Sequence, residues 1–278
     1  MAFKMEKIQK KLRCFICKSV EIFFITEFFR GGKIYGCRKC QNAFTVPQPD
    51  FKYSNTEKFV FKESSYREAE SISKRILEFI NKFITQGKFL DIGSGVGSLI
   101  DLANKNGFLA EGIEPSLPAV NLCRKKGLQV KKGYFEKAQY KADAFNIVTL
   151  SHVLEHIENP GKFLSKVSRV LKKDGFLFLA QTNYKGTIPE ILGKFWEGWV
   201  TDQHFVHFSP EGIKYFLKNH NFRPVKIELV SGYKLLWRWG NMGTIFNNIY
   251  YSVNFILSVI LGNTGFKGDQ MYVIARKI

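Results

Sequence analysis

Acidic residues are scarce in this chain of 278 residues. Aspartate and glutamate together number 24, against 42 lysines and arginines, so the formal net charge at pH 7 is +18. This balance favours an anionic partner, such as a nucleic acid, a phosphorylated small molecule or a membrane surface. The lysines are scattered along the chain, however, and that distribution is more typical of a solvated surface than of a binding patch.

The chain also lacks features that define other classes of protein. Its first twelve residues are charged and contain no apolar run, so we expect no secretory signal and a cytoplasmic location. No internal repeat or low-complexity tract occurs, which argues against a repeat architecture. Hydrophobic residues make up 45% of the chain. This length predicts one core of about 200 residues with a small additional module.

The most apolar segment is short. Residues 245–261 form an apolar run that is interrupted by three asparagines and two serines. The run is marginal for a helix that spans a bilayer, which needs roughly 20 apolar residues. Its apolar residues recur at the spacing of one helix face. Three interpretations stay open: a core helix, a lid over an apolar substrate pocket, or an interfacial helix that gives peripheral contact with a membrane.

Cysteine is rare, but four of the five cysteines form an ordered pattern. Cys14-x-x-Cys17 and Cys37-x-x-Cys40 are separated by residues 18–36. Two such pairs at this spacing predict a zinc ribbon, in which four sulfurs bind one structural Zn²⁺ and leave no open position for catalysis. The residues between the pairs are typical of a strand, a glycine turn and a strand. A pair of disulfides is the alternative, but nothing in the sequence suggests export.

Three glycines in one short segment are the most informative feature of the chain. Residues 89–97 read Phe-Leu-Asp-Ile-Gly-Ser-Gly-Val-Gly, and an apolar helical pattern follows. This segment predicts a strand, a tight turn and a helix whose first N–H groups face the turn. A dinucleotide site needs a third glycine where this chain has Ser98, so the spacing indicates a different ligand.

A second predicted strand ends in an acid. Residues 109–114 read Leu-Ala-Glu-Gly-Ile-Glu, so Glu114 lies at the tip of this strand, one predicted helix after Gly97. A carboxylate there accepts hydrogen bonds from both hydroxyls of an adenosine ribose. A solvated glutamate at a strand end is the plainer alternative, but the nearby glycine turn favours the ribose contact.

The pattern D-x-G-x-G-x-G, from Asp91 to Gly97, resembles the first motif of the class I S-adenosylmethionine-dependent methyltransferases. Residues 145–160 are similar to a later motif of the same family, an apolar strand followed by a Leu-Glu-His run and a proline. The resemblance covers about residues 85–278. It implies an α/β, Rossmann-like fold with a seven-stranded, mostly parallel sheet whose last strand is antiparallel, in addition to the small N-terminal zinc ribbon.

These observations predict the following organisation. The zinc ribbon covers residues 1–46, and a linker with an N-terminal helix covers residues 47–84. The methyltransferase domain covers residues 85–278, and its substrate or lid segments lie at about 183–215 and 240–265.

The resemblance also implies the cofactor, S-adenosyl-L-methionine, and the residues that bind it. Asp91 takes part in a polar network near the cofactor amine, Glu114 binds the ribose, and Tyr134 or Phe135 stacks on the adenine. Asn146 stands where the family commonly has aspartate, so the acidic role is not carried over. The predicted cofactor-binding residues are Asp91, Gly93, Ser94, Gly95, Gly97, Glu114, Pro115, Tyr134, Phe135, Ser151 and His152.

Four of the five histidines fall in two clusters, His152 with His156 and His204 with His207. Both clusters are expected near the carboxyl end of the sheet, where open α/β sheets bind ligands, so all four are candidate catalytic bases. Packing or turn formation is the alternative for each of them. The first cluster also matches an inverted zinc-protease pattern, which we reject because Pro160 ends the segment too early for a long metal-binding helix.

The sequence therefore predicts a methyltransferase that acts on a small molecule, anionic or apolar, such as an activated sugar, a cell-envelope metabolite or a secondary metabolite. The reaction expected is an in-line displacement at the cofactor's methyl group. Two alternatives stay open. One is a tRNA or rRNA methyltransferase, which the ribbon and the positive charge support. The other is a non-catalytic, cofactor-binding scaffold that uses the ribbon to bind a partner.

Overall fold

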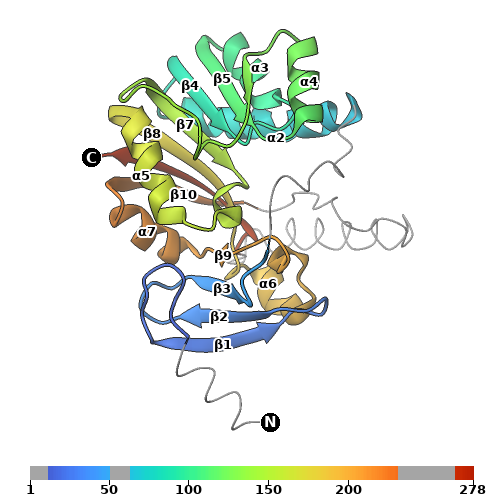
Figure 1. The fold of residues 1–278 in the computed structure, drawn as a ribbon, viewed down its shortest axis with the longest axis vertical. Coiled ribbons are helices and arrows are strands. Elements are labelled where there is room, and N and C mark those ends of the chain that lie inside the picture. Colours follow the sequence, from blue (N-terminus) through green and yellow to red (C-terminus); the bar gives the residue numbers. More distant parts are fainter. Residues whose placement is uncertain (1–11, 51–62, 231–266) are drawn as a thin grey trace. The chain divides into compact units, whose positions relative to one another are not determined.

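The computed structural model describes residues 12–50, 63–230 and 267–278 (Figure 1). The apolar segment 245–261 and the predicted lid 240–265 lie outside the described residues. None of the helices within the described ranges has the combination of length and apolar character that crossing a bilayer requires.

The chain divides into two compact units, which we describe separately. We call them the cysteine unit and the sheet unit. The cysteine unit comprises residues 1–49, 182–213 and 228–271, and the sheet unit comprises residues 50–181, 214–227 and 272–278.

A seven-stranded sheet is the centre of the larger unit, with the strand order β10-β11-β8-β7-β4-β5-β6. Strand β4 pairs in parallel with β5 and β7, and β7 pairs in parallel with β8. The sheet is mixed and mostly parallel, which confirms the predicted Rossmann-like α/β fold. The strands are β4 (Gly87–Ile92), β5 (Phe108–Glu114), β6 (Val130–Lys132), β7 (Phe145–Ser151), β8 (Leu171–Thr182), β10 (Phe222–Val230) and β11 (Gln270–Lys277).

Helices connect and cover these strands. The predicted N-terminal helix is α2, and its apolar face packs on the sheet, where the Phe79 ring lies 5.9 Å from the ring of Phe178 and 5.7 Å from that of Tyr272. The helices are α2 (Glu63–Asn81), α3 (Ser98–Lys105), α4 (Leu117–Lys125), η2 (Leu154–His156), α5 (Pro160–Val170) and α7 (Pro210–Lys218).

The predicted strand, glycine turn and helix are confirmed. Strand β4 ends at Ile92, the turn covers residues 93–97, and α3 begins at Ser98. Strand β5 ends at Glu114 and β7 ends at Ser151. Because β4, β5 and β7 run parallel, their carboxyl ends lie along one edge of the sheet, which is where ligands bind in open α/β folds.

The cysteine unit contains a four-stranded antiparallel sheet of order β1-β2-β3-β9. The predicted strand, turn and strand of the ribbon are β1 and β2. Strand β9 comes from much later in the chain and completes the sheet beside β3. The elements of this unit are β1 (Ile22–Glu27), β2 (Lys33–Cys37), β3 (Ala43–Val46), α6 (Thr187–Leu192), η3 (Gly193–Phe195), η4 (Glu197–Trp199) and β9 (Val206–His207).

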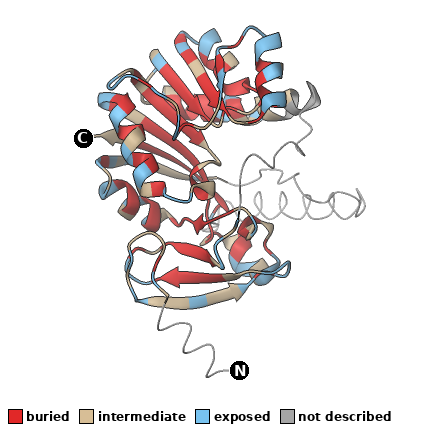
Figure 2. Cartoon of the chain, viewed as in Figure 1, coloured by how far each residue is buried: buried red, intermediate tan, exposed pale blue. Residues whose placement is uncertain are grey.

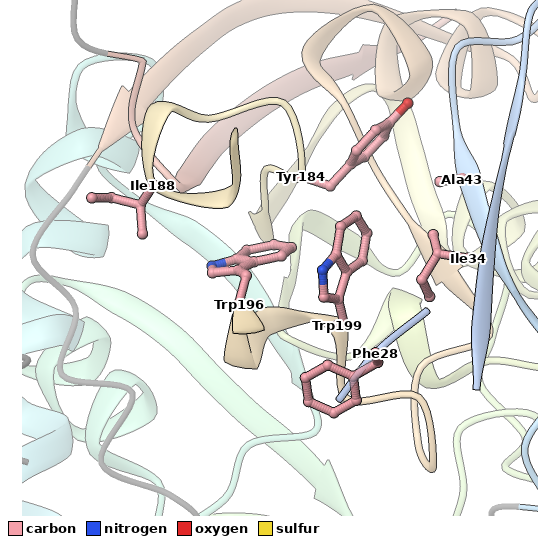
Figure 3. Close-up of a cluster of buried hydrophobic side chains, with 7 residues drawn as sticks. All are labelled: Phe28, Ile34, Ala43, Tyr184, Ile188, Trp196 and Trp199. Carbon is pink, nitrogen blue, oxygen red and sulfur yellow. The ribbon is translucent and has the colours of Figure 1, made fainter. Parts of the chain in front are cut away.

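This unit has its own hydrophobic core, in which Ile34 and Phe28 of the ribbon lie with Trp196 and Trp199 (Figure 3). Buried residues accordingly concentrate in the strands of each sheet (Figure 2). Residues 182–213 thus belong to the same compact unit as the cysteines, so this unit extends beyond the predicted ribbon boundary. The physical reason is that a short ribbon has little apolar surface of its own to bury.

Candidate functional site

The glycine turn after β4 leaves room beside one of its residues. Gly95 has a φ of 51°, and a Cβ atom built there would meet nothing within 4 Å. Gly97 differs, because its Cβ would lie 2.8 Å from the Cys123 sulfur, so this glycine allows α4 to pack against the turn. At Gly93 a Cβ would lie 2.5 Å from a methyl group of Val153. Only Gly95 therefore combines positive φ with open space in this turn.

The carboxylate of Glu114 closes over the same turn. Its two oxygens accept hydrogen bonds from the backbone N–H groups of Gly95, at 2.9 Å, and Ser116, at 2.8 Å. The side chain is buried, and burial raises the pKa of this carboxyl while the two N–H groups oppose the rise. Each carboxylate oxygen has a second lone pair, so Glu114 keeps the capacity to accept from a ligand. Pro115, which follows, is half-buried.

A second buried carboxyl lies in β4. Asp91 accepts a hydrogen bond of 2.6 Å from the hydroxyl of Thr149, which lies opposite it on β7. Burial raises the pKa of Asp91 to about 7; the Glu114 charge also raises it, while the Thr149 hydroxyl lowers it. A buried acid whose pKa is raised in this way, at the ligand-binding edge of the sheet, is a candidate functional residue.

Two further predicted cofactor-binding residues, Ser94 and Phe135, are buried against neighbouring side chains or backbone. The Ser94 hydroxyl is buried, lies against Gly112 of β5, and has no hydrogen-bond partner among the described residues. The Phe135 ring is buried between the rings of Tyr140 and Phe163, at centroid distances of 5.9 and 5.3 Å. Phe135 thus packs among core residues, and the adenine contact of Tyr134 or Phe135 stays a prediction. Tyr134 is half-buried and is the more accessible aromatic side chain of the two.

The segment after β7 carries the first histidine cluster. His152 adopts a φ of 53°, an uncommon conformation for a side chain of this size, and its N–H donates to the carbonyl of Ala180. Its Nδ1 lies 3.1 Å from a carboxylate oxygen of the buried Glu155. His156 ends η2, a single turn of three residues, which agrees with our rejection of a helical zinc-protease site. The half-buried Ser151 precedes this turn.

The second histidine cluster belongs to the cysteine unit. His204 and His207 are both buried, and their ring centroids lie 5.8 Å apart. The His207 ring also meets the edge of the Trp199 ring at 5.0 Å, and its Nε2 lies 3.0 Å from the hydroxyl of Thr45. Of the four candidate histidines, two therefore belong to each unit.

The four predicted metal ligands do come together. The sulfur atoms of Cys14, Cys17, Cys37 and Cys40 all lie within 4.8 Å of one another. No pair is joined as a disulfide. Backbone N–H groups donate to several of these sulfurs, and Cys14 accepts from two of them. Such N–H···S bonds stabilise thiolates, so the donor set fits a tetrahedral metal ion held by four sulfurs.

Sequence reasoning missed two threonines of these sites. Thr149 interrupts the apolar run of β7, and this polar residue in a buried strand was the signal available for a partner of Asp91. Thr45 gave no comparable signal, because its partners His204 and His207 follow much later in the chain.

Comparison with known proteins identifies the fold family. Residues 64–227, more than half of the chain, match a family described as a methyltransferase domain. The structure of an S-adenosylmethionine-dependent methyltransferase from Archaeoglobus fulgidus is similar, with a TM-score of 0.55 and 22% identity. The match covers 82% of this chain and 100% of that one.

Two curated relatives are similar in sequence. An uncharacterized protein of Methanocaldococcus jannaschii is 28% identical over 167 residues, which cover 58% of this chain and 77% of that protein. A ubiquinone biosynthesis O-methyltransferase of Hahella chejuensis is 28% identical over 130 residues, 44% of this chain and 55% of that enzyme. The chain thus spans about half the length of the latter. From the match to residues 64–227 and the seven-stranded sheet, the chain belongs to the class I S-adenosylmethionine-dependent methyltransferases.

Proposed function

We propose that this protein transfers a methyl group from S-adenosyl-L-methionine to an oxygen, nitrogen or carbon atom of a small-molecule acceptor. One observation carries the proposal. The glycine turn has open space beside Gly95, and the buried carboxylate of Glu114 reaches the N–H of that residue. The site therefore fits a ligand that needs close backbone approach and an acceptor for hydroxyl groups.

Different residues at the carboxyl edge of the sheet would bind different parts of the cofactor. Glu114 would accept hydrogen bonds from the ribose hydroxyls, Asp91 would hold the cofactor's ammonium group, and Tyr134 would stack on the adenine. The backbone at Gly95 approaches the cofactor without a side chain in the way. When bound, S-adenosylmethionine supplies a methyl group on a positively charged sulfur, which is an activated leaving group.

Methyl transfer then requires that the acceptor atom be aligned with the cofactor's methyl group and that a proton be removed from the acceptor. The candidate bases are His152, His156, His204 and His207. For His152 the local geometry defines the role of each nitrogen. An ionised carboxylate only accepts hydrogen bonds, so an ionised Glu155 would hold a proton on Nδ1 of His152 and leave Nε2 as the basic nitrogen. A proton taken from the acceptor would pass to that Nε2.

Two observations bear on the class of acceptor. A curated relative is named as an O-methyltransferase of ubiquinone biosynthesis, which supports an oxygen acceptor on an organic metabolite. We therefore place a hydroxylated small molecule first, whether an activated sugar, a cell-envelope metabolite or a secondary metabolite. The net charge of +18 favours RNA as the second candidate.

We further propose that the four-sulfur cluster holds one structural Zn²⁺. The sulfurs are numerous enough to fill the coordination shell, so the ion would have no open position for substrate. Its role would be to hold the two cysteine pairs together.

The test of the cofactor site is a Gly95→Ala variant. An added methyl group would occupy the open space, so we expect the affinity for S-adenosylhomocysteine, measured by calorimetric titration, to fall at least about tenfold, or about 1.4 kcal/mol. Gly107 supplies a matched control, because it also has positive φ, 91°, and an equally open Cβ position. Gly107→Ala should impose similar backbone strain, about 1–2 kcal/mol, and leave binding unchanged.

Several results of this experiment would count against the proposal. A wild-type protein that binds neither S-adenosylmethionine nor S-adenosylhomocysteine would favour the scaffold function instead. Equal losses of affinity in the Gly95 and Gly107 variants would mean that backbone strain, and not occupied space, explains the effect. If the protein binds cofactor and co-purifies with RNA that is released by salt, the RNA acceptor replaces the metabolite.

A further inference from the structure

A buried threonine of the ribbon makes two contacts with the second histidine cluster. Thr45 lies in β3 and is fully buried. Its Oγ1 lies 2.7 Å from the backbone carbonyl oxygen of His204 and 3.0 Å from Nε2 of His207. One hydroxyl group thus serves two partners, and the roles of the two contacts depend on where the hydroxyl hydrogen points.

The roles follow from hydrogen-bond chemistry. A carbonyl oxygen has no hydrogen to give, so the contact with His204 exists only if Thr45 donates. A threonine hydroxyl has one hydrogen, and that hydrogen is then used. Towards His207, Oγ1 therefore acts as the acceptor, and Nε2 of His207 must carry a proton. The reverse arrangement would leave the two oxygens of Thr45 and His204 in close contact with no hydrogen between them.

We infer that Thr45 is a positioning residue that fixes the tautomer of His207, with the proton on Nε2 and the lone pair on Nδ1. The inference rests on the proposed function, in which His207 is one of the candidate bases. It specifies that Nε2 of the buried His207 carries the proton and that, in the neutral ring, Nδ1 is the nitrogen with the basic lone pair.

The surrounding structure holds this arrangement in place. Strand β3 pairs antiparallel with β9, where Ala43 lies opposite His207. The N–H of Thr45 donates to the carbonyl of Phe205 at 3.3 Å, and the edge of the Trp199 ring packs on the imidazole. Backbone pairing fixes Thr45 relative to the histidine segment, and the indole restricts rotation of the ring. The ribbon is therefore part of what orients this histidine.

The tautomer is directly measurable, because two-bond ¹H–¹⁵N correlation spectra distinguish a protonated ring nitrogen from a bare one. The chain has only five histidines, and a His207→Gln variant identifies the signals of His207. We expect the wild-type spectrum at neutral pH to show a proton on Nε2 and a bare Nδ1. A ring with the proton on Nδ1, or on both nitrogens, would overturn the inference.

Two variants then test whether Thr45 is the cause. Thr45→Val keeps the shape of the side chain but removes the hydroxyl, so we expect the spectrum of His207 to move towards the other tautomer. Thr45→Ser retains the hydroxyl and should restore the wild-type pattern. If Thr45→Val unfolds, the wild-type and serine spectra still decide where the proton is. An unchanged spectrum in a folded Thr45→Val variant would overturn the role of Thr45.

A titration with S-adenosylhomocysteine separates this inference from the proposed function. Thr45 and the glycine turn belong to different units, so Thr45→Val should bind with wild-type affinity. A wild-type protein that does not bind the cofactor would contradict the proposed function. The spectra would still show which nitrogen of His207 carries the proton. The opposite combination, normal binding with the wrong tautomer, would contradict the inference alone.

Discussion

At the scale of the residue, the site depends on two acids that are kept out of water. Glu114 is held by two backbone N–H groups, and Asp91 by the hydroxyl of Thr149. Burying carboxyls in this way lowers stability unless they are protonated or paired, so folds keep them where a function needs charge to appear. Of the two, Asp91 has the more informative pH behaviour, since burial raises its pKa to about 7.

The pKa of Asp91 predicts a pH dependence of cofactor binding. An ammonium group beside Asp91 favours the ionised carboxylate, so binding would release a proton from the protein. The affinity for S-adenosylhomocysteine should therefore rise as the pH increases towards about 7, by at most about tenfold per pH unit, and level off above it. Calorimetric titrations from about pH 5.5 to 8.5 would measure this slope.

Protein stability should change in the opposite sense. The folded-state pKa of Asp91, about 7, lies above the value near 3.9 that is typical of an unfolded chain. Between these values the folded protein binds a proton that the unfolded chain lacks, so this contribution to stability is lost as the pH rises through the window.

An Asp91→Asn variant tests the binding prediction. It should bind S-adenosylhomocysteine more weakly, and its affinity should change much less with pH. A variant with the wild-type slope would show that another group is responsible.

At the scale of the element, the junction of β9 and α7 depends on Ser209. Its hydroxyl donates to the carbonyl of Gln41 at 2.6 Å and accepts from the N–H of Gly212 at 3.0 Å, as an N-cap of α7. Ser209→Ala should lower the free energy of unfolding by about 1 kcal/mol, because it removes the cap and one of the two hydroxyl donors to the Gln41 carbonyl, leaving only that of Tyr184. Denaturant unfolding followed by circular dichroism measures this loss.

Ser165 offers a matched control in another helix. It is exposed in α5, and its hydroxyl donates back to the carbonyl of Gly161, one turn earlier. Alanine has the higher helix propensity at such a position, so Ser165→Ala should be neutral or slightly stabilising, by a few tenths of a kcal/mol. Similar losses in the two serine variants would argue against a special role for the junction.

The sequence was sufficient to predict the elements that are built from local patterns. The glycine turn between β4 and α3, the acid at the end of β5 and the helix α2 were predictable, because strand ends, turns and helix faces are encoded by neighbouring residues. The four cysteines were predictable for the same reason, since the spacing within each pair is local and the metal chemistry joins the pairs.

The remaining features depend on contacts that no local pattern encodes. Strand β9 is only two residues long and exists because β3 has a free edge. Tyr134 or Phe135 was predicted to contact adenine, and the packing of Phe135 between the rings of Tyr140 and Phe163 could not be read from the nearby residues. The partners of Thr45 lie far away in sequence. Long-range packing of this kind overrides what the nearby residues suggest.

At the scale of the molecule, the chain couples the four-cysteine ribbon to a segment that lies between β8 and β10 in sequence. Residues 1–49 and 182–213 belong to one compact unit with a shared hydrophobic core. Gln41, which follows Cys40, accepts hydrogen bonds from Tyr184 and Lys185 of that segment. Because the ribbon shares a core and hydrogen bonds with residues 182–213, it does not form a module that is packed independently of the rest of the chain.

Metal removal should therefore affect the two units differently. Structural zinc binds zinc-finger peptides with about 10–16 kcal/mol, and that binding energy is folding energy. The cysteine unit has a hydrophobic core of its own, but its two cysteine pairs would lose the ion that joins them. After chelation under reducing conditions we expect calorimetry to show loss of the cysteine unit's thermal transition. The sheet unit should keep its own transition and its affinity for S-adenosylhomocysteine, because the glycine turn and Glu114 belong to that unit.

Two cysteine variants separate metal loss from the general effect of losing a thiol. Cys17→Ser removes one ligand and should abolish stoichiometric zinc, measured by atomic absorption, whereas Cys123→Ala should retain one ion per chain. Cys123 is buried against the glycine turn, so its substitution should affect cofactor binding instead. A chelated protein with both transitions intact would mean that protein packing alone holds the four cysteines together. In that case the segment carrying His204 and His207 would be ordered independently of metal, and its histidines would keep their spectra.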